Sequence, residues 1–105
     1  MNINIKATNT TLTPAIKKDI QDKMAKLSKF LRPEDKIHVE VEVEKKHKSG
    51  LVQRAEITIR PHGHYAEARG VDFYAALDLA IPKILEQLAK KKDKMVSERR
   101  RRTKI

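Results

Sequence analysis

Positively charged side chains are the residues of this sequence with the clearest capacity to do chemistry. The chain of 105 residues has 24 Lys and Arg against 14 Asp and Glu, which gives a formal net charge of +10. Residues 90–105, KKKDKMVSERRRRTKI, hold nine of these cations and two carboxylates. This distribution favours a polyanionic partner, with nucleic acid ahead of an acidic membrane surface. The alternative is a solvated tail that only keeps the protein soluble.

Part of this charge has the spacing of one helix face. At about 100° per residue, Lys83, Lys90 and Lys94 project from one line, opposite the apolar stripe of the same segment and beside Ala76 and Gln87. A lysine line on a helix is usually only a solvated face, but this one continues into the arginine run. We therefore predict phosphate contacts from a set of eight cations: Lys83, Lys90, Lys91, Lys94, Arg99, Arg100, Arg101 and Arg102.

Other reactive residue types are poorly arranged for catalysis or metal binding. The chain has no Cys, so it has no thiolate nucleophile and no disulfide. His62 and His64 flank Gly63 in a predicted turn, with His38 and His47 elsewhere, and make at best a partial metal site, so surface histidines on a turn are the favoured interpretation. Three glutamates alternate along one predicted strand, where they form no cleft: Glu40, Glu42 and Glu44. We therefore predict a binding protein that is not an enzyme and needs no cofactor or metal.

The elements that must position the cations follow from hydrophobic periodicity. Alternation with a period of two predicts strands at 2–8, 37–45, 51–60 and 64–69. Apolar stripes predict helices at about 14–31 and from 73 onward. Thr13 and Pro14 are suited to begin the first helix, and Asp72 is suited to cap the second. Phe73 and Tyr74 fall on the second apolar stripe, so we expect both to be structural core residues and not a base-stacking pair.

The order strand–helix–strand–strand–strand–helix predicts an α+β sandwich with both helices on one face of a four-stranded sheet. We expect a single domain over residues 1–95 and a basic, flexible tail over 96–105. The open sheet face would carry the three glutamates, which repel phosphate, so the helical side should bind the polyanion. Neither a signal peptide nor an apolar run of about 18 residues occurs, which predicts a cytoplasmic protein without a membrane partner.

Several stretches resemble one family, the short ribosome hibernation-promoting factors and the ribosome-associated inhibitors also called protein Y. The resemblance covers about residues 2–94 and is most specific in Gly70-x-Asp72-x-Tyr74-Ala75-Ala76-Leu77-Asp78. It implies a β-α-β-β-β-α fold similar to the double-stranded-RNA-binding domain. It also implies a monomer that binds the small ribosomal subunit and its ribosomal RNA in the mRNA and tRNA channel. Whole ribosomes would thereby be held inactive by steric occlusion, under stress or in stationary phase.

Two alternatives remain open at this point. One is a general double-stranded-RNA or DNA binder, and the other is a basic structural component of the ribosome, because each needs the same basic helix face. The sequence also departs from the family at Pro82, which is expected to bend the second helix near Asp78 and Leu79.

Overall fold

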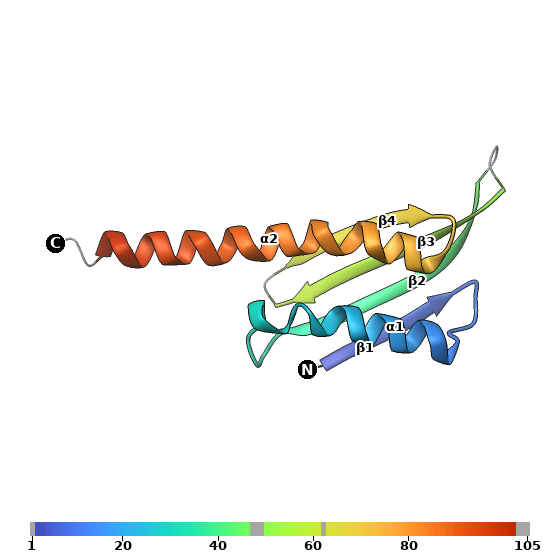
Figure 1. Cartoon of the computed structure of the whole chain (residues 1–105), viewed down its shortest axis with the longest axis horizontal. Helices are drawn as coiled ribbons and strands as arrows, with labels where there is room; N and C mark the ends of the chain where they lie inside the picture. Colours follow the sequence, from blue (N-terminus) through green and yellow to red (C-terminus); the bar gives the residue numbers. More distant parts are fainter. Residues whose placement is uncertain (1, 47–49, 62, 103–105) are drawn as a thin grey trace.

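The computed structural model describes residues 2–46, 50–61 and 63–102, and it describes side chains up to Lys90 except that of Lys46. Figure 1 shows the predicted order of elements, which is confirmed. The sheet strands are β1 (Asn2–Thr8), β2 (Lys36–Lys46), β3 (Gly50–Arg60) and β4 (His64–Gly70). The helices are α1 (Pro14–Ala25), the short 3-10 helix η1 (Ser28–Phe30) and α2 (Phe73–Arg102).

The four strands form one mixed sheet in the order β1-β2-β3-β4. β1 runs parallel to β2, whereas β2–β3 and β3–β4 are antiparallel neighbours. A parallel pair needs a crossover connection between its strands, and α1 supplies it. The two antiparallel pairs are joined directly by turns, as the alternating pattern predicts.

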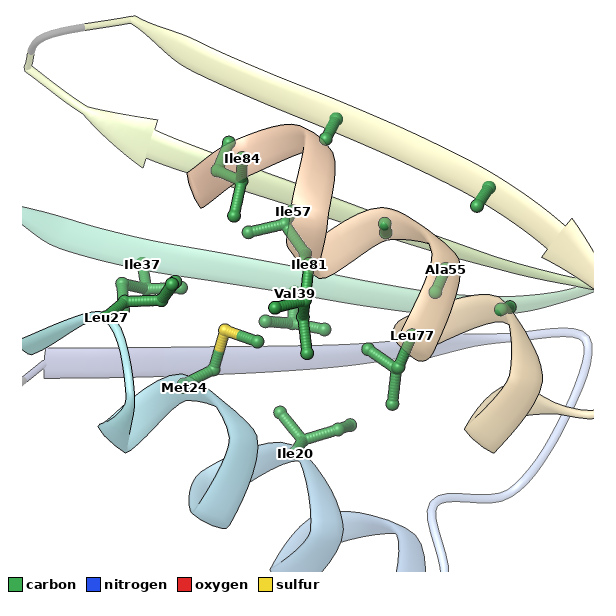
Figure 2. Close-up of a cluster of buried hydrophobic side chains, with 14 of the residues drawn as sticks. Ile20, Met24, Leu27, Ile37, Val39, Ala55, Ile57, Leu77, Ile81 and Ile84 are labelled. Atoms are coloured by element: carbon green, nitrogen blue, oxygen red, sulfur yellow. The ribbon is translucent and has the colours of Figure 1, made fainter. Parts of the chain in front are cut away.

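The core lies between the sheet and the two helices. In Figure 2, apolar side chains from one face of β2 and β3 contact those of α1 and of α2, and the two helices lie next to each other over that face. Both helices therefore cover the same sheet face, as predicted, and leave the opposite face open. The large side chains removed completely from solvent include Ile20, Met24, Leu27, Ile37, Ile57, Ile59, Leu77 and Ile84.

The first helix is shorter than predicted. The expected helix of about 14–31 ends at Ala25, and the chain then tightens into η1. The amide groups of Leu27, Phe30 and Leu31 each bond to a carbonyl three residues earlier, at 2.9 to 3.2 Å. This tighter winding turns the chain at the point where Leu27 packs beside Ile37 (Figure 2). The start of α1 agrees with the prediction, because the Thr13 hydroxyl accepts a hydrogen bond from the Ile16 amide.

The start of α2 depends on Asp72 and Gly70. Asp72 is confirmed as the helix cap, since its Oδ1 accepts a 2.7 Å hydrogen bond from the Ala75 amide. Gly70, the last residue of β4, lies directly against the first turn of α2. A Cβ atom added to Gly70 would lie 3.0 Å from the backbone nitrogen of Ala76, so only glycine permits this approach without a shift. The pair therefore fixes the turn between β4 and α2.

The two adjacent aromatic residues have different roles. Phe73 is 4% exposed and belongs to the core, as predicted. The prediction that Tyr74 is also a core residue is wrong, because Tyr74 is 40% exposed. Its ring lies 5.8 Å from the Nζ of Lys23, between α1 and α2. Tyr74 therefore contributes to the contact between the helices and not to the packing on the sheet.

The buried side of α2 is displaced from the expected one. Ala76, predicted beside the exposed lysines, is fully buried, as is Ala80. Leu79 points outward with 55% exposure. Pro82 is exposed and lies inside α2, which continues past it without a sharp bend in Figure 1. The helix is thus continuous through Pro82, and the view in Figure 1 shows no sharp bend corresponding to the expected one at Asp78 and Leu79.

Replacing the two aromatics separately tests this assignment. Phe73→Ala should lower the free energy of unfolding by about 3–5 kcal/mol, because it leaves a cavity in the core. Tyr74→Ala should cost only about 1 kcal/mol, the size of a partly exposed cation–π contact. Chemical denaturation of the two variants beside the parent measures both values, and equal losses would contradict the assignment.

Candidate nucleic-acid interface

A charged network occupies the open face of the sheet, with Arg54 at its centre. The Arg54 side chain is only 10% exposed, although it lies on the uncovered face. Its Nε donates to Glu67 at 2.9 Å, and its Nη1 donates to Glu40 at 3.1 Å and to Glu42 at 3.3 Å. Its Nη2 donates to Glu56. Burial alone would lower the pKa of Arg54, but these hydrogen bonds to carboxylates raise it.

The carboxylates of this network are held in their ionised form. The Tyr65 hydroxyl and the Arg54 guanidinium both donate to Glu67 and lower its pKa from 4.5 to about 2. The Thr8 hydroxyl donates to Glu40 at 2.9 Å, and together with Arg54 it lowers the pKa of that carboxyl against the opposing effect of burial. The sheet face therefore keeps its negative charges and pairs them internally.

The charges of the described side chains on the open face consequently balance, whereas those of the chain do not. Its described side chains include five glutamates and five cations: Glu40, Glu42, Glu44, Glu56 and Glu67, with Lys6, Lys36, Arg54, Arg60 and Arg69. The net charge of +10 must therefore reside on the rest of the chain, which includes both helices. The charge distribution agrees with the expectation that the polyanion binds on the helical side.

The residues predicted to contact phosphate differ in where their side chains lie and in what they contact. The Nζ of Lys83 donates to the backbone carbonyl of Glu67 at 3.0 Å, so Lys83 lies against β4 and not opposite the core. Lys90 is exposed and pairs with Glu86 at 3.0 Å, one helical turn away. The remaining predicted residues fall in the part of α2 whose side chains are not described: Lys91, Lys94, Arg99, Arg100, Arg101 and Arg102.

Further exposed cations lie on the first helix and were not predicted as contacts. Lys17 and Lys18 lie near the start of α1, and Lys26 and Lys29 lie at its end and in η1. None of them forms an ion pair with another described residue. The Nζ of Lys29 lies 5.2 Å from the centre of the Phe30 ring. In the sequence, the recurrence of lysine on the polar side of the predicted first helix could have indicated these exposed cations.

A second unpredicted pair lies at the end of the sheet. Lys36 at the start of β2 and Arg60 at the end of β3 are directly opposite each other. Two like charges in this position destabilise a sheet, and neither residue has a carboxylate partner among the described side chains. Figure 1 shows that this end of the sheet, η1 and the projecting part of α2 all lie at the same end of the molecule. Unpaired cations of η1 and of this end of the sheet therefore lie where α2 leaves the body, whereas Lys17 and Lys18 lie near the start of α1.

Lys23, by contrast, holds the two helices together. Its Nζ lies 2.8 Å from Asp19 on α1 and 2.8 Å from Asp78 on α2. Burial alone would lower the pKa of Lys23, but the hydrogen bonds to both carboxylates raise it above its usual value. The side chain is 15% exposed. Lys23 therefore fixes the spacing of α1 and α2 and is not available to a phosphate group.

Other kinds of site find little support in the described residues. A hollow of about 440 Å³ on the open face is lined by polar groups that include Asn4, His38 and Thr58. No group of three or more His, Asp or Glu side chains in the described ranges could hold a metal ion. His47 and His62 lie outside those ranges. Neither helix, over the residues described, is long and apolar enough to cross a bilayer.

The family of the chain follows from its similarity to known proteins. The family model described as "Sigma 54 modulation protein / S30EA ribosomal protein" matches residues 3–96. The chain belongs to this family. It is 34% identical over 97 residues to the ribosome hibernation promoting factor of Klebsiella oxytoca, covering 90% of this chain and 97% of that protein. The corresponding factor of Escherichia coli (strain K12) is 33% identical over the same shares.

A longer relative and two solved structures agree with this membership. The ribosome hibernation promotion factor of Bacillus subtilis is 33% identical over 98 residues, which cover 50% of its length. A ribosomal subunit interface protein from Coxiella burnetii has the same fold, with a TM-score of 0.72 at 22% identity over 89% of this chain and 99% of that one. The Protein Y N-terminal domain of Thermus thermophilus gives a TM-score of 0.65 at 26% identity, over 86% and 98%. The resemblance predicted from the sequence is confirmed.

The depressed pKa of Glu67 predicts acid sensitivity. Because the folded pKa of about 2 lies below the usual 4.5, ionised Glu67 stabilises the fold above pH 4.5, and this contribution is lost as the pH falls toward 2. The melting temperature should therefore fall over that window, and Glu67→Gln should reduce the fall. Glu86→Gln, which removes an exposed carboxylate of α2, is the matched control. A parent-like pH profile for Glu67→Gln would contradict the network.

Proposed function

We propose that this protein is a ribosome hibernation factor that binds the small ribosomal subunit in the channel for mRNA and tRNA. Occupation of the channel would repress translation by steric exclusion, without a catalytic step. The observation that carries this proposal is the division of charge between the two faces. On the open sheet face Arg54 pairs with glutamates, and the exposed cations without carboxylate partners among the described side chains lie on α1, on η1 and in the Lys36–Arg60 pair at the end of the sheet from which α2 projects.

The names of the relatives support a role at the ribosome. The proteins of Klebsiella oxytoca and Escherichia coli that match over nearly their whole length are called ribosome hibernation promoting factors. The Coxiella burnetii protein with the same fold is called a ribosomal subunit interface protein. A basic helical face on such a protein has an available polyanion, because the phosphate groups of ribosomal RNA line the subunit surface.

The mechanism relies on electrostatics and shape. Each phosphate neutralised by Lys or Arg releases counterions, and this release supplies most of the affinity of sequence-independent binding. The molecule measures 60 × 29 × 18 Å along its principal axes, so α2 extends the reach of the basic end well beyond the sheet. Its core-facing residues and Arg54 would have no contact with RNA. Their role is to hold the cationic surface in a fixed shape.

Removing cations from one side or the other tests the proposed surface. The double variant Lys26→Gln/Lys29→Gln takes two charges from the proposed surface, and Lys6→Gln/Lys45→Gln takes two from elsewhere. The first should weaken binding to small subunits and flatten the log–log dependence on salt by up to about 1.8 units, given roughly 0.7–0.9 per lost phosphate contact. The second should retain the parent slope. Equal slopes for the two doubles would show that binding does not use the proposed surface.

A second experiment separates a channel-binding factor from a general RNA binder. On a sucrose gradient of cell lysate, the protein should migrate with small subunits and whole ribosomes. Its binding to purified small subunits should be lost when mRNA and tRNA occupy the channel beforehand. Spreading through the light fractions would instead support a general double-stranded-RNA binder. Constant, stoichiometric occupancy in all growth phases would support a structural component of the ribosome.

A further inference from the structure

Side chains of α2 occupy the free edge of the sheet. β4 is an edge strand, so the outward amide and carbonyl groups of its backbone have no neighbouring strand. Gln87 bonds to both groups of Tyr65: its Oε1 accepts from the Tyr65 amide at 3.2 Å, and its Nε2 donates to the Tyr65 carbonyl at 2.7 Å. Lys83 donates to the Glu67 carbonyl at 3.0 Å. Three hydrogen bonds thus join α2 to the edge of β4.

The spacing of these partners explains how the contact forms. Lys83 and Gln87 are four residues apart and lie on one side of the helix, about 6 Å apart along its axis. Their partners Glu67 and Tyr65 are two residues apart on a strand, about 6.6 Å along its direction. The distance between Lys83 and Gln87 along the helix therefore matches the distance between their two partners along the strand. Since an amide donates and a carbonyl accepts, Gln87 is held in one orientation.

We propose that Gln87, supported by Lys83, is a positioning residue that fixes the direction in which α2 leaves the body. Leu88, at 6% exposure, is the last residue of α2 with a described buried side chain. Beyond it the helix projects past the end of the sheet, as Figure 1 shows. Gln87 lies immediately before this point, so its hydrogen bonds act where the helix loses the support of the core.

A small change of angle at this point has a large effect at the far end of α2. From Gln87 to Arg102 the helix extends about 22 Å, so a swing of about 10° moves its end by about 4 Å. No described buried side chain of α2 lies beyond Leu88 to resist such a swing, and the hydrogen bonds of Gln87 beside it are directional. A helix held in one direction also loses less conformational freedom on binding than a mobile one. The consequence for RNA binding rests on the proposed function, whereas the clamp itself does not.

The orientation of α2 is measurable without any partner. The parent chain has no Cys, so spin labels can be placed at Asp22→Cys on α1 and Ser97→Cys on α2. Double electron–electron resonance between the two spin labels should give a narrow distance distribution in the doubly labelled parent. Gln87→Leu, which keeps the size of the side chain but neither hydrogen bond, should broaden it by about 3 Å, the displacement of Ser97, about 15 Å beyond Gln87, for a 10° swing. Lys83→Met should broaden it less, and Glu86→Gln, a neighbour that does not contact β4, should leave it unchanged.

Circular dichroism must accompany this measurement, because a variant that unfolds also broadens the distribution. If Gln87→Leu does not fold, Lys83→Met decides the question, since it removes one of the three hydrogen bonds and keeps the alkyl stem. A folded variant with the parent's distribution would overturn the proposal.

Binding to small ribosomal subunits supplies the second measurement. Folded Gln87→Leu should bind several-fold more weakly than the parent and Glu86→Gln, with a flatter salt dependence. Weaker binding with an unchanged distance distribution would mean that Gln87 contacts the RNA directly, which also overturns the positioning role. If the parent itself does not bind, the proposed function fails, and the spin-label distances still decide whether Gln87 orients α2.

Discussion

The interaction on which the rest of the structure depends is the burial of Arg54 among glutamates on the open sheet face. Glu40, Glu56 and Glu67 are direct cross-strand neighbours in β2, β3 and β4, so three carboxylates stand in one row. Such a row would destabilise the sheet, because like charges oppose each other at close range. The Arg54 guanidinium bonds to all three and also to Glu42. This single cation thereby offsets the repulsion among the carboxylates on a sheet face that neither helix covers.

This pairing separates the charges of the molecule. Five glutamates are held on the sheet, where they cannot neutralise the lysines of the helices through short contacts. The helical side consequently keeps unpaired cations on α1 and η1, although two lysines of the same layer have structural partners. Lys23 joins the two helices through Asp19 and Asp78, and Lys83 joins α2 to β4. The same residue type thus serves for cohesion in some positions and for an exposed charge in others.

The strands and most of the core could be predicted because alternation depends only on local spacing. The placement of α2 could not, since the helical wheel gives weight to Leu and Ile. Ala76 and Ala80 are small enough to let the helix approach β4, which rotates its buried side toward them and leaves Tyr74 at the margin. The end of α1 was also missed. The helix gives way to the tighter turns of η1 as Leu27 enters the same buried cluster as Ile37, a contact between residues distant in sequence that local spacing does not report.

The candidate site shows the same limit. Composition predicted a polyanionic partner. The arginine run predicted that part of the contact surface lies at the C-terminal end of α2. Whether a given lysine is available depends on partners distant in sequence, such as Asp78 for Lys23 and the Glu67 carbonyl for Lys83. The cross-strand pair Lys36 and Arg60 becomes visible only when the register of β2 and β3 is known.

A net charge of +10 is therefore a poor measure of how many phosphates the protein meets. Counterion release counts only those cations that replace ions at a phosphate group. Arg54, Lys23 and Arg69 already have carboxylate partners, and exchanging these for phosphate would loosen the sheet or the helix layer. Among the described side chains, Lys17, Lys18, Lys26 and Lys29 of α1 and η1 are exposed cations without such a partner. The fold thus uses its paired charges to hold a shape and leaves other cations exposed on α1 and η1.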